Sequence, residues 1–303
     1  MKGISVRSEI APLKTVLLHR PGEELLNLTP DTLGELLFDD IPDLKEAQVE
    51  HDRFANILRD NGVEVVYLED LMAETLDAHP EIKEQFLDQF IEEAGIHTPE
   101  YHKILKEYYG KFTNNKELVL KTMSGVRFDE LGDVKTNNLV DCISADSYLL
   151  VNPMPNLYFT RDPFASVGNG AVINRMYSVT RNRETIYADY IFRFHPEYAG
   201  NVPDLYGRKN PFHIEGGDVL NVNEKLLFIG MSQRTQPDAI QQLAMKMFYE
   251  NKGNKIETIL AFNIPVSRAF MHLDTVFTQI DKDAFTIHPG IMGTLQVFAI
   301  TAD

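Results

Sequence analysis

The chain has 303 residues, with 45 acidic and 29 basic side chains and a formal net charge of −16. Its apolar content of 44% is ordinary for a globular protein and excludes a disordered or low-complexity chain. One cysteine excludes a disulfide scaffold and a cysteine-based metal cluster. The acidic balance argues against binding to nucleic acid, which needs a basic face, and is compatible with a cationic small substrate.

Apolar runs in the sequence are short. The longest, such as Val63–Leu68 and Tyr148–Val151, fall far below the roughly 20 residues that a membrane helix needs. The start of the sequence has no apolar signal core. We therefore expect a cytoplasmic protein that does not bind a membrane.

Residues 1–70 have the pattern of a small α/β unit, which we take as the first module. Lys14–His19 is an expected strand, Leu44–Leu58 has apolar residues at helical spacing, and Val63–Leu68 is a strand rich in branched residues. Residues 71–147 differ, because Glu, Lys, Leu and Gln dominate them. Two apolar stripes at helical spacing predict that this stretch is an inserted bundle of helices. The stripes consist of Ile82, Phe86, Phe90 and Ile91, and of Tyr101, Ile104, Leu105 and Tyr108.

Strand signals return over residues 148–303, which we assign to further modules. Extended runs are expected at Tyr148–Val151, Leu157–Thr160 and Ala171–Ile173, followed by a helix at Thr185–Phe194. Next come a hairpin of Glu215–Asn221 and Lys225–Ile229, a helix at Gln236–Tyr249 and a strand at Ile256–Phe262. The last expected elements are a hairpin of Phe270–Ile280 and Ala284–His288 and a strand at Leu295–Thr301. Hairpin, helix and strand recur about every 40–50 residues, which indicates a radial or stacked repeat whose last copy is incomplete.

Polar motifs stand near the first expected strand of three successive modules. They are Asn156–Pro163, His213–Asp218 and Met271–Thr275. If the modules surround one axis, the first strands point to one centre and bring three carboxylates and one imidazole into a single pocket. These side chains are Asp162, Glu215, His272 and Asp274.

Such a pocket has a definite chemistry. His272 and Asp274 are two residues apart, so on a strand they project from the same face. Glu215 is suited to bind the second ring nitrogen of His272, which fixes the tautomer and raises the basicity of the ring. Carboxylates at Asp162 and Asp274 are suited to hold a planar guanidinium through paired hydrogen bonds.

Each motif also has a plainer interpretation. Taken alone, Arg161-Asp162 is more often a local salt bridge, and Glu-Gly-Gly-Asp is as often a tight turn. A metal site built from His272, Asp274 and Asp218 is an alternative. Loop arginines are usually solvated charges, although two of them near a pocket suit a substrate carboxylate. The recurrence of the motifs in successive modules favours a functional site.

Together these motifs resemble the bacterial arginine deiminases of the guanidino-modifying, pentein-fold superfamily. The segments that carry the resemblance are Lys14–Gly22, Leu37–Pro42, Asn61–Val65, Phe159–Pro163, Glu215–Asp218 and His272–Thr275. The resemblance implies an α/β fold, a pentein-type propeller of ββαβ modules with an inserted helical bundle. It implies hydrolysis of L-arginine to L-citrulline and ammonia through a cysteine thiouronium, without a cofactor or a metal.

The resemblance also implies roles for individual residues. Asp162 and Asp274 would hold the substrate guanidinium, His272 would be the general acid and base, and Glu215 would orient it. The remaining expected substrate-binding residues are Asn156, Phe159, Arg181, Arg234 and Asp218.

Members of this family carry their nucleophilic cysteine in a glycine-rich segment near the C-terminus, and this sequence stops before it. Cys142 does not match that position, and its apolar surroundings predict a buried, inert thiol. We therefore expect a truncated deiminase that is inactive alone. The alternatives are a non-catalytic arginine-binding fragment or subunit, an amidinotransferase and an agmatine deiminase. The open sheet edges of an incomplete propeller predict a homo-oligomer.

Overall fold

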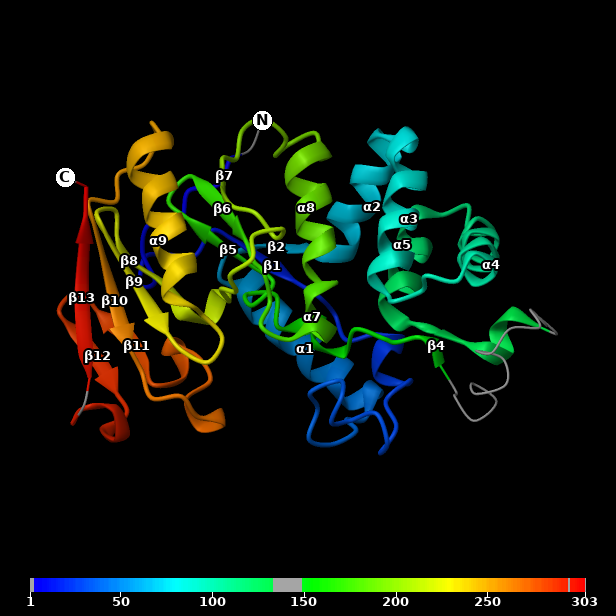
Figure 1. The fold of residues 1–303 in the computed structure, drawn as a ribbon, viewed down its shortest axis with the longest axis horizontal. Coiled ribbons are helices and arrows are strands. Elements are labelled where there is room, and N and C mark those ends of the chain that lie inside the picture. Colours follow the sequence, from blue (N-terminus) through cyan, green and yellow to red (C-terminus); the bar gives the residue numbers. More distant parts are fainter. Residues whose placement is uncertain (1–2, 133–148, 294, 303) are drawn as a thin grey trace. The chain divides into compact units, whose positions relative to one another are not determined.

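The computed structural model describes residues 3–132, 149–293 and 295–302 (Figure 1). The chain forms two compact units. The first, here called the modular unit, comprises residues 1–13 and 159–303, and the second, here called the helical unit, comprises residues 14–158. Cys142 lies outside the described residues, as does the start of the strand that we expected at Tyr148. The boundaries expected at residues 70 and 147 stay a prediction.

Two ββαβ modules form most of the modular unit. The first consists of β5 (Phe164–Val167), β6 (Gly170–Ile173), α7 (Val179–Asn182), α8 (Thr185–Phe194) and β7 (Asp204–Tyr206). The second consists of β8 (Val219–Asn223), β9 (Leu226–Met231), α9 (Pro237–Met245) and β10 (Thr258–Asn263). In both, the first two strands pair antiparallel and the third strand lies parallel to the second. The mixed α/β class and the repeated hairpin, helix and strand are therefore confirmed.

The last strands of the modular unit do not share one sheet. β11 (Phe277–Asp281) pairs with β12 (Ala284–Ile287) as a two-stranded hairpin. β13 (Gln296–Thr301) instead pairs antiparallel with β10, so the larger sheet has the order β13-β10-β9-β8 (Figure 1). The strand that we expected to complete the last module thus extends the sheet of the preceding one.

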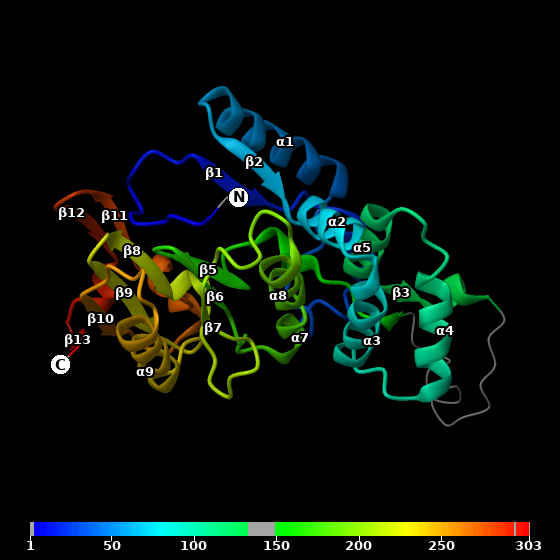
Figure 2. The ribbon, with the colours of Figure 1, turned by 90° about the horizontal axis from the view of Figure 1, so that it is seen from above.

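The helical unit begins with two parallel strands, β1 (Thr15–Leu18) and β2 (Glu64–Tyr67). They are joined through α1 (Leu44–Asp60), which lies beside β2 in Figure 2. The Asp43 side chain caps α1 by accepting the Glu46 amide at 2.9 Å.

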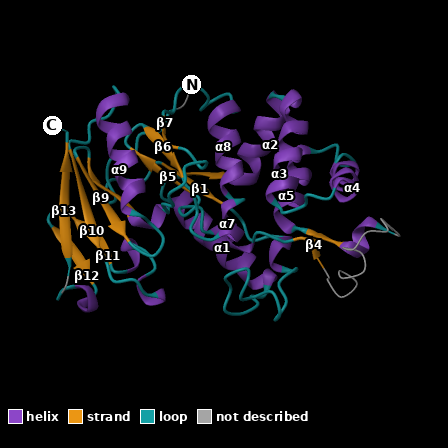
Figure 3. Ribbon diagram, viewed as in Figure 1, coloured by secondary structure: helices purple, strands orange, loops and turns teal. Residues whose placement is uncertain are grey.

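The helices expected between the two strand regions are present (Figure 3). They are α2 (Leu68–Ala78), α3 (Lys83–Glu93), α4 (Pro99–Tyr109) and α5 (Asn115–Ser124). A short ladder of β3 (Val126–Arg127) and β4 (Leu149–Val151) follows. No helix in the described part of the chain has the length and apolarity to cross a membrane.

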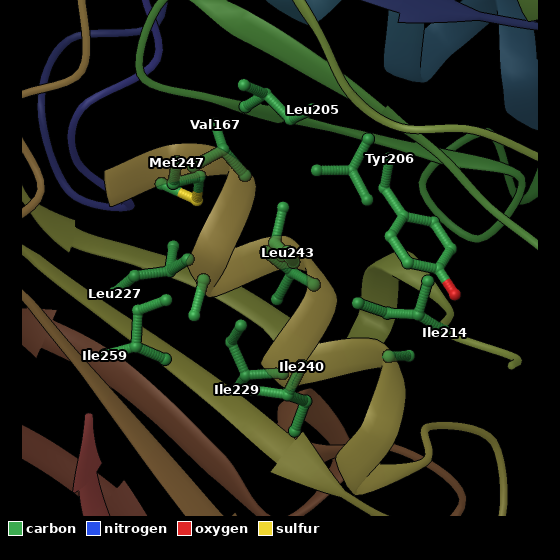
Figure 4. Close-up of a cluster of buried hydrophobic side chains, with 14 of the residues drawn as sticks. Val167, Leu205, Tyr206, Ile214, Leu227, Ile229, Ile240, Leu243, Met247 and Ile259 are labelled. Atoms are coloured by element: carbon green, nitrogen blue, oxygen red, sulfur yellow. The ribbon is translucent and has the colours of Figure 1, made fainter. Parts of the chain in front are cut away.

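A single apolar cluster joins the two modules of the modular unit (Figure 4). On α9, Ile240 and Leu243 are three residues apart and share one face of the helix. On β9, Leu227 and Ile229 are two residues apart and share one face of the sheet, and they pack against α9 together with Ile259 of β10. Each such side chain contributes roughly 1.5–3 kcal/mol when it is buried. The modules that carry the polar motifs therefore form one packed body.

A second cluster holds the β11–β12 hairpin to the larger sheet. Its centre is aromatic, with Phe228 and Phe262 at 4.8 Å between ring centroids and Phe262 and Phe277 at 5.5 Å. Phe285 of β12 lies 5.1 Å from Phe277. This packing replaces backbone pairing between the hairpin and the sheet.

One expected strand is absent, and two others begin later than expected. Leu157–Thr160 is not a strand, since Pro155–Tyr158 forms a 3-10 helix. The strand expected from Glu215 begins at Val219, after the 3-10 helix η6 (Gly216–Asp218). The strand expected from Phe270 begins at Phe277, after the 3-10 helix η9 (Leu273–Thr275). Polar side chains bond to the backbone in these segments, and such bonds compete with the hydrogen bonds of a strand.

Candidate active site

Each polar motif lies directly before the first strand of a hairpin. Asp162 precedes β5, η6 precedes β8, and η9 precedes β11. η6 and η9 pack against each other. His272 and Asp274 are therefore placed by a 3-10 turn rather than by one face of a strand. The gathering of the motifs that the repeat predicted is nevertheless present.

The centre of the site is a buried pair of His272 and Glu215. His272 Nε2 lies 2.8 Å from Glu215 Oε2, and both side chains are buried. Burial alone would lower the pKa of His272, but the hydrogen bond to Glu215 and the charges of Asp218 and Asp162 raise it. Burial alone would raise the pKa of Glu215, but His272 and two arginines lower it. The pair thus favours a protonated imidazole beside an ionised carboxylate.

Asp162 belongs to a second ion-pair network. Its Oδ2 accepts Arg181 Nη1 at 2.8 Å. Arg181 also donates through Nη2 to Glu184 at 2.8 Å and through Nε at 3.1 Å. Burial raises the pKa of Glu184 and the charges of Asp162 and Glu215 add to this effect, whereas Arg181 opposes it.

Glu184 was not among the expected site residues. Its spacing of three residues from Arg181 matches a helical ion pair, which in a sequence usually marks a solvated surface. In the structure both side chains are buried. The sequence does not reveal that this pair is buried. The pair is joined to the site because Arg181 also binds Asp162.

Asp274 is the more accessible of the two carboxylates expected to hold a guanidinium. Its side chain is 34% exposed, and Arg161 Nε lies 4.0 Å from its Oδ2. Burial raises its pKa, while the charges of His272 and Arg161 oppose the rise. Arg161 forms ion pairs with Glu9 and donates to two backbone carbonyls instead of pairing with its neighbour Asp162.

Asp218 points into the protein. Its Oδ2 accepts the hydroxyls of Ser232 and Thr235, both at 2.6 Å, and its Oδ1 accepts the Leu273 amide at 2.8 Å. The side chain is fully buried, and burial raises its pKa to about 6. We expected Asp218 to bind substrate. Its contacts instead hold the turn that carries His272, so we propose a positioning role for it.

The remaining expected residues lie in different settings. Arg234 Nη1 is 3.8 Å from Glu215 Oε1, and its guanidinium lies 5.2 Å from the centre of the Tyr177 ring. Phe159 is 44% exposed. Asn156 belongs to the helical unit, where its Nδ2 donates to the Leu36 carbonyl at 2.7 Å.

Acidic groups outnumber cations in this network. Five carboxylates, Asp162, Glu184, Glu215, Asp218 and Asp274, are set against four cationic groups, Arg161, Arg181, Arg234 and His272. A surplus of carboxylates with low exposure favours a cationic ligand. Over the described residues, no group of three or more His, Cys, Asp or Glu side chains is arranged to hold a metal ion.

A family model described as arginine deiminase matches residues 34–303. The chain belongs to the arginine deiminase family. An arginine deiminase of Treponema denticola is 58% identical over 301 residues, which cover 99% of this chain and 73% of that protein. One from Clostridium perfringens is 53% identical over 303 residues, which cover 100% of this chain and 73% of that protein.

A solved structure of an amidinotransferase in the saxitoxin pathway of Microseira wollei is also similar to the chain. Its TM-score is 0.47 at 14% identity, over 95% of this chain and 72% of that one. Membership of the arginine deiminase family places the chain among hydrolases that act on C–N bonds and in arginine metabolism. The resemblance seen in the sequence is thereby confirmed, and neither an amidinotransferase nor an agmatine deiminase is better supported.

In this deiminase-family chain, Glu215→Gln is expected to lower the pKa of His272. The amide removes the negative charge and leaves the lowering effect of burial less opposed. An NMR titration of the histidine ring signals measures the change, with Glu224→Gln on the surface as the control. An unchanged His272 pKa in Glu215→Gln would contradict the pairing.

Proposed function

We propose that the chain binds L-arginine, with the guanidinium held by Asp162 and Asp274. The single observation that carries this proposal is the buried His272–Glu215 pair set among surplus carboxylates. Carboxylates match the planar N–H edges of a guanidinium and bind it through paired, charge-assisted hydrogen bonds. Family membership supports arginine as the substrate.

The proposed reaction is hydrolysis of the guanidinium to a ureido group. One C–N bond breaks, ammonia leaves, and the oxygen of water ends on the same carbon. His272 is the proposed proton donor to the leaving ammonia and the acceptor of the proton from water. Glu215 keeps the ring protonated and oriented.

The described residues contain no cysteine, so the thiol expected to attack the guanidinium carbon is not assigned to a position. Binding of arginine without turnover is therefore the second candidate function. A citrulline assay separates the two candidates, because sustained product formation requires catalysis.

The test of the binding proposal is titration calorimetry with L-arginine and L-citrulline. The two share the amino-acid part and differ in the charge of the terminal group. We expect arginine to bind at least about tenfold more tightly, which corresponds to one charge-assisted hydrogen bond. Equal affinity for the two ligands, or no binding of arginine, would contradict the proposed function.

We also propose a cytoplasmic homo-oligomer. A single cysteine suits a reducing compartment. Support for self-association comes from the edge strand β13, on which Val297 is 44% and Phe298 51% exposed. We further propose that Arg181, Arg234 and Phe159 contribute to substrate binding.

A further inference from the structure

Thr235 lies between two polar groups of the candidate active site. It belongs to the turn between β9 and α9, and it is 1% exposed. Its Oγ1 accepts the Glu215 amide at 3.2 Å and donates to Asp218 Oδ2 at 2.6 Å. A single buried hydroxyl therefore joins the backbone of the residue that binds the imidazole to the carboxylate that holds the turn η9.

These bonds belong to a closed ring of contacts. Asp218 Oδ1 accepts the Leu273 amide at 2.8 Å, and Leu273 directly follows His272. His272 Nε2 lies 2.8 Å from Glu215 Oε2, which returns the ring to the residue whose amide Thr235 binds. Because buried hydrogen bonds in a network support one another, η6 and η9 are held together through their backbones as well as through the His272–Glu215 bond.

The turn that presents Thr235 is itself fixed by a hydroxyl. Ser232 Oγ accepts the amides of Arg234 and Thr235 at 2.9 and 3.2 Å. It also donates to Asp218 Oδ2 at 2.6 Å. Ser232 thus shapes the turn, whereas Thr235 is the residue of that turn whose hydroxyl reaches both Asp218 and Glu215.

The direction of these bonds favours an ionised Asp218. A hydroxyl has one proton to donate, and an ionised carboxylate only accepts. Burial raises the pKa of Asp218, whereas the charge of His272 and the bonds from Ser232, Thr235 and the Leu273 amide oppose that rise. Loss of the Thr235 hydroxyl therefore favours the neutral form of Asp218.

The charge of Asp218 in turn affects the imidazole. Burial lowers the pKa of His272, whereas the bond to Glu215 and the charges of Asp218 and Asp162 raise it. A neutral Asp218 leaves the effect of burial less opposed. Thr235 therefore supports a protonated His272 in two ways, through the position of Glu215 and through the charge of Asp218.

We infer that Thr235 is a positioning residue for the His272–Glu215 pair, because its hydroxyl ties the Glu215 backbone to the carboxylate that holds the turn of His272. It acts through Glu215 and Asp218, which carry its effect to the imidazole. The inference rests on the proposed function where it treats His272 as the group that transfers protons. The contacts themselves are tested without a ligand.

Thr235→Val is the test, because valine replaces the hydroxyl with a methyl group of similar size. Hydrogen exchange at the Glu215 amide is expected to be at least about tenfold faster, as for the loss of one hydrogen bond. An NMR titration of the His272 ring is expected to give a lower pKa than in the wild type. Thr235→Ser keeps the hydroxyl and is expected to restore both values. No change in the valine variant, or the same changes in the serine variant, would overturn the inference.

The matched control is Thr75→Val. Thr75 lies on α2 and is fully buried, and its Oγ1 donates to the Leu71 carbonyl at 2.7 Å. This variant also loses one buried hydroxyl, but in the helical unit. The pKa of His272 is expected to stay unchanged, and a fall equal to that in Thr235→Val would overturn the inference. Circular dichroism and thermal unfolding establish that each variant folds.

Should Thr235→Val fail to fold, the wild-type chain decides. Its Thr235 hydroxyl proton is expected to exchange slowly with water and to show a nuclear Overhauser contact with the Glu215 amide. A proton that exchanges too fast to be observed would overturn the inference.

Calorimetry of the wild type with L-arginine separates this inference from the proposed function. If arginine binds but the Thr235 variants leave the His272 titration unchanged, the inference is wrong and the proposed function stands. If arginine does not bind but the variants behave as expected, the proposed function fails and the positioning role of Thr235 stands.

Discussion

Asp274→Asn is expected to weaken the binding of L-arginine by about a hundredfold, the equivalent of two charge-assisted hydrogen bonds of roughly 1.5 kcal/mol each. The amide has nearly the shape of the carboxylate but no charge, and one of its atoms is a donor that faces the N–H groups of the ligand. Asp274 is more accessible than Asp162, and its contact with Arg161 is 4.0 Å whereas that of Asp162 with Arg181 is 2.8 Å, so its loss is masked less by a neighbouring cation. Calorimetry at constant pH and salt measures the change.

Asp281→Asn is the control for this prediction. Asp281 ends β11, in the same hairpin, and is exposed. Its replacement removes an equal charge without touching the site, and arginine affinity is expected to change less than about threefold, as for a screened surface charge. A similar loss in both variants would mean that Asp274 acts only through the general negative field of the protein.

Gly216→Ala is expected to destabilise the modular unit by at least about 3 kcal/mol. A Cβ at this position would overlap the carbonyl oxygen of Arg161, which is backbone and cannot rotate away. The same shift would disturb the hydrogen bond of 3.1 Å from Arg161 Nε to the Gly216 carbonyl. For a unit of this size, thermal unfolding is expected to show a melting temperature about 6–12 °C lower in the variant.

Gly293→Ala serves as the control for Gly216. A Cβ at Gly293 has no heavy atom within 4 Å, and its φ is not in the left-handed region. We expect a change within about 0.5 kcal/mol, as for an ordinary surface substitution. Equal melting temperatures for the two variants would show that η6 relaxes around a side chain.

The sequence predicted best the bounds of elements in which an apolar pattern extends over many residues. The helix expected over Thr185–Phe194 has these bounds in the structure, and most of its residues are buried. The errors fall at the polar motifs before β5, β8 and β11, and the last two motifs show the cause. There Asp218 accepts the Leu273 amide and the Thr275 hydroxyl donates to the His272 carbonyl, and these bonds turn the backbone before a strand can start.

The sequence predicted those parts of the site that follow from the repetition of the ββαβ module. Equivalent positions in repeated modules bring Asp162, Glu215 and His272 into electrostatic reach of one another. The roles of Glu184 and Asp218 were not predictable, because they depend on burial and on which way a side chain turns. Neither burial nor side-chain orientation can be inferred from residue type or spacing alone.

The aromatic packing beneath the β11–β12 hairpin has a consequence for motion. A two-stranded ribbon has little stability of its own, so rings such as Phe262 and Phe277 set how often it lifts from the sheet. η9 leads directly into β11, and lifting would draw His272 away from Glu215. Proton binding at the imidazole and the equilibrium for local opening of the ribbon are therefore thermodynamically linked, and because the pKa of His272 is raised in the closed state, deprotonation of the ring favours opening.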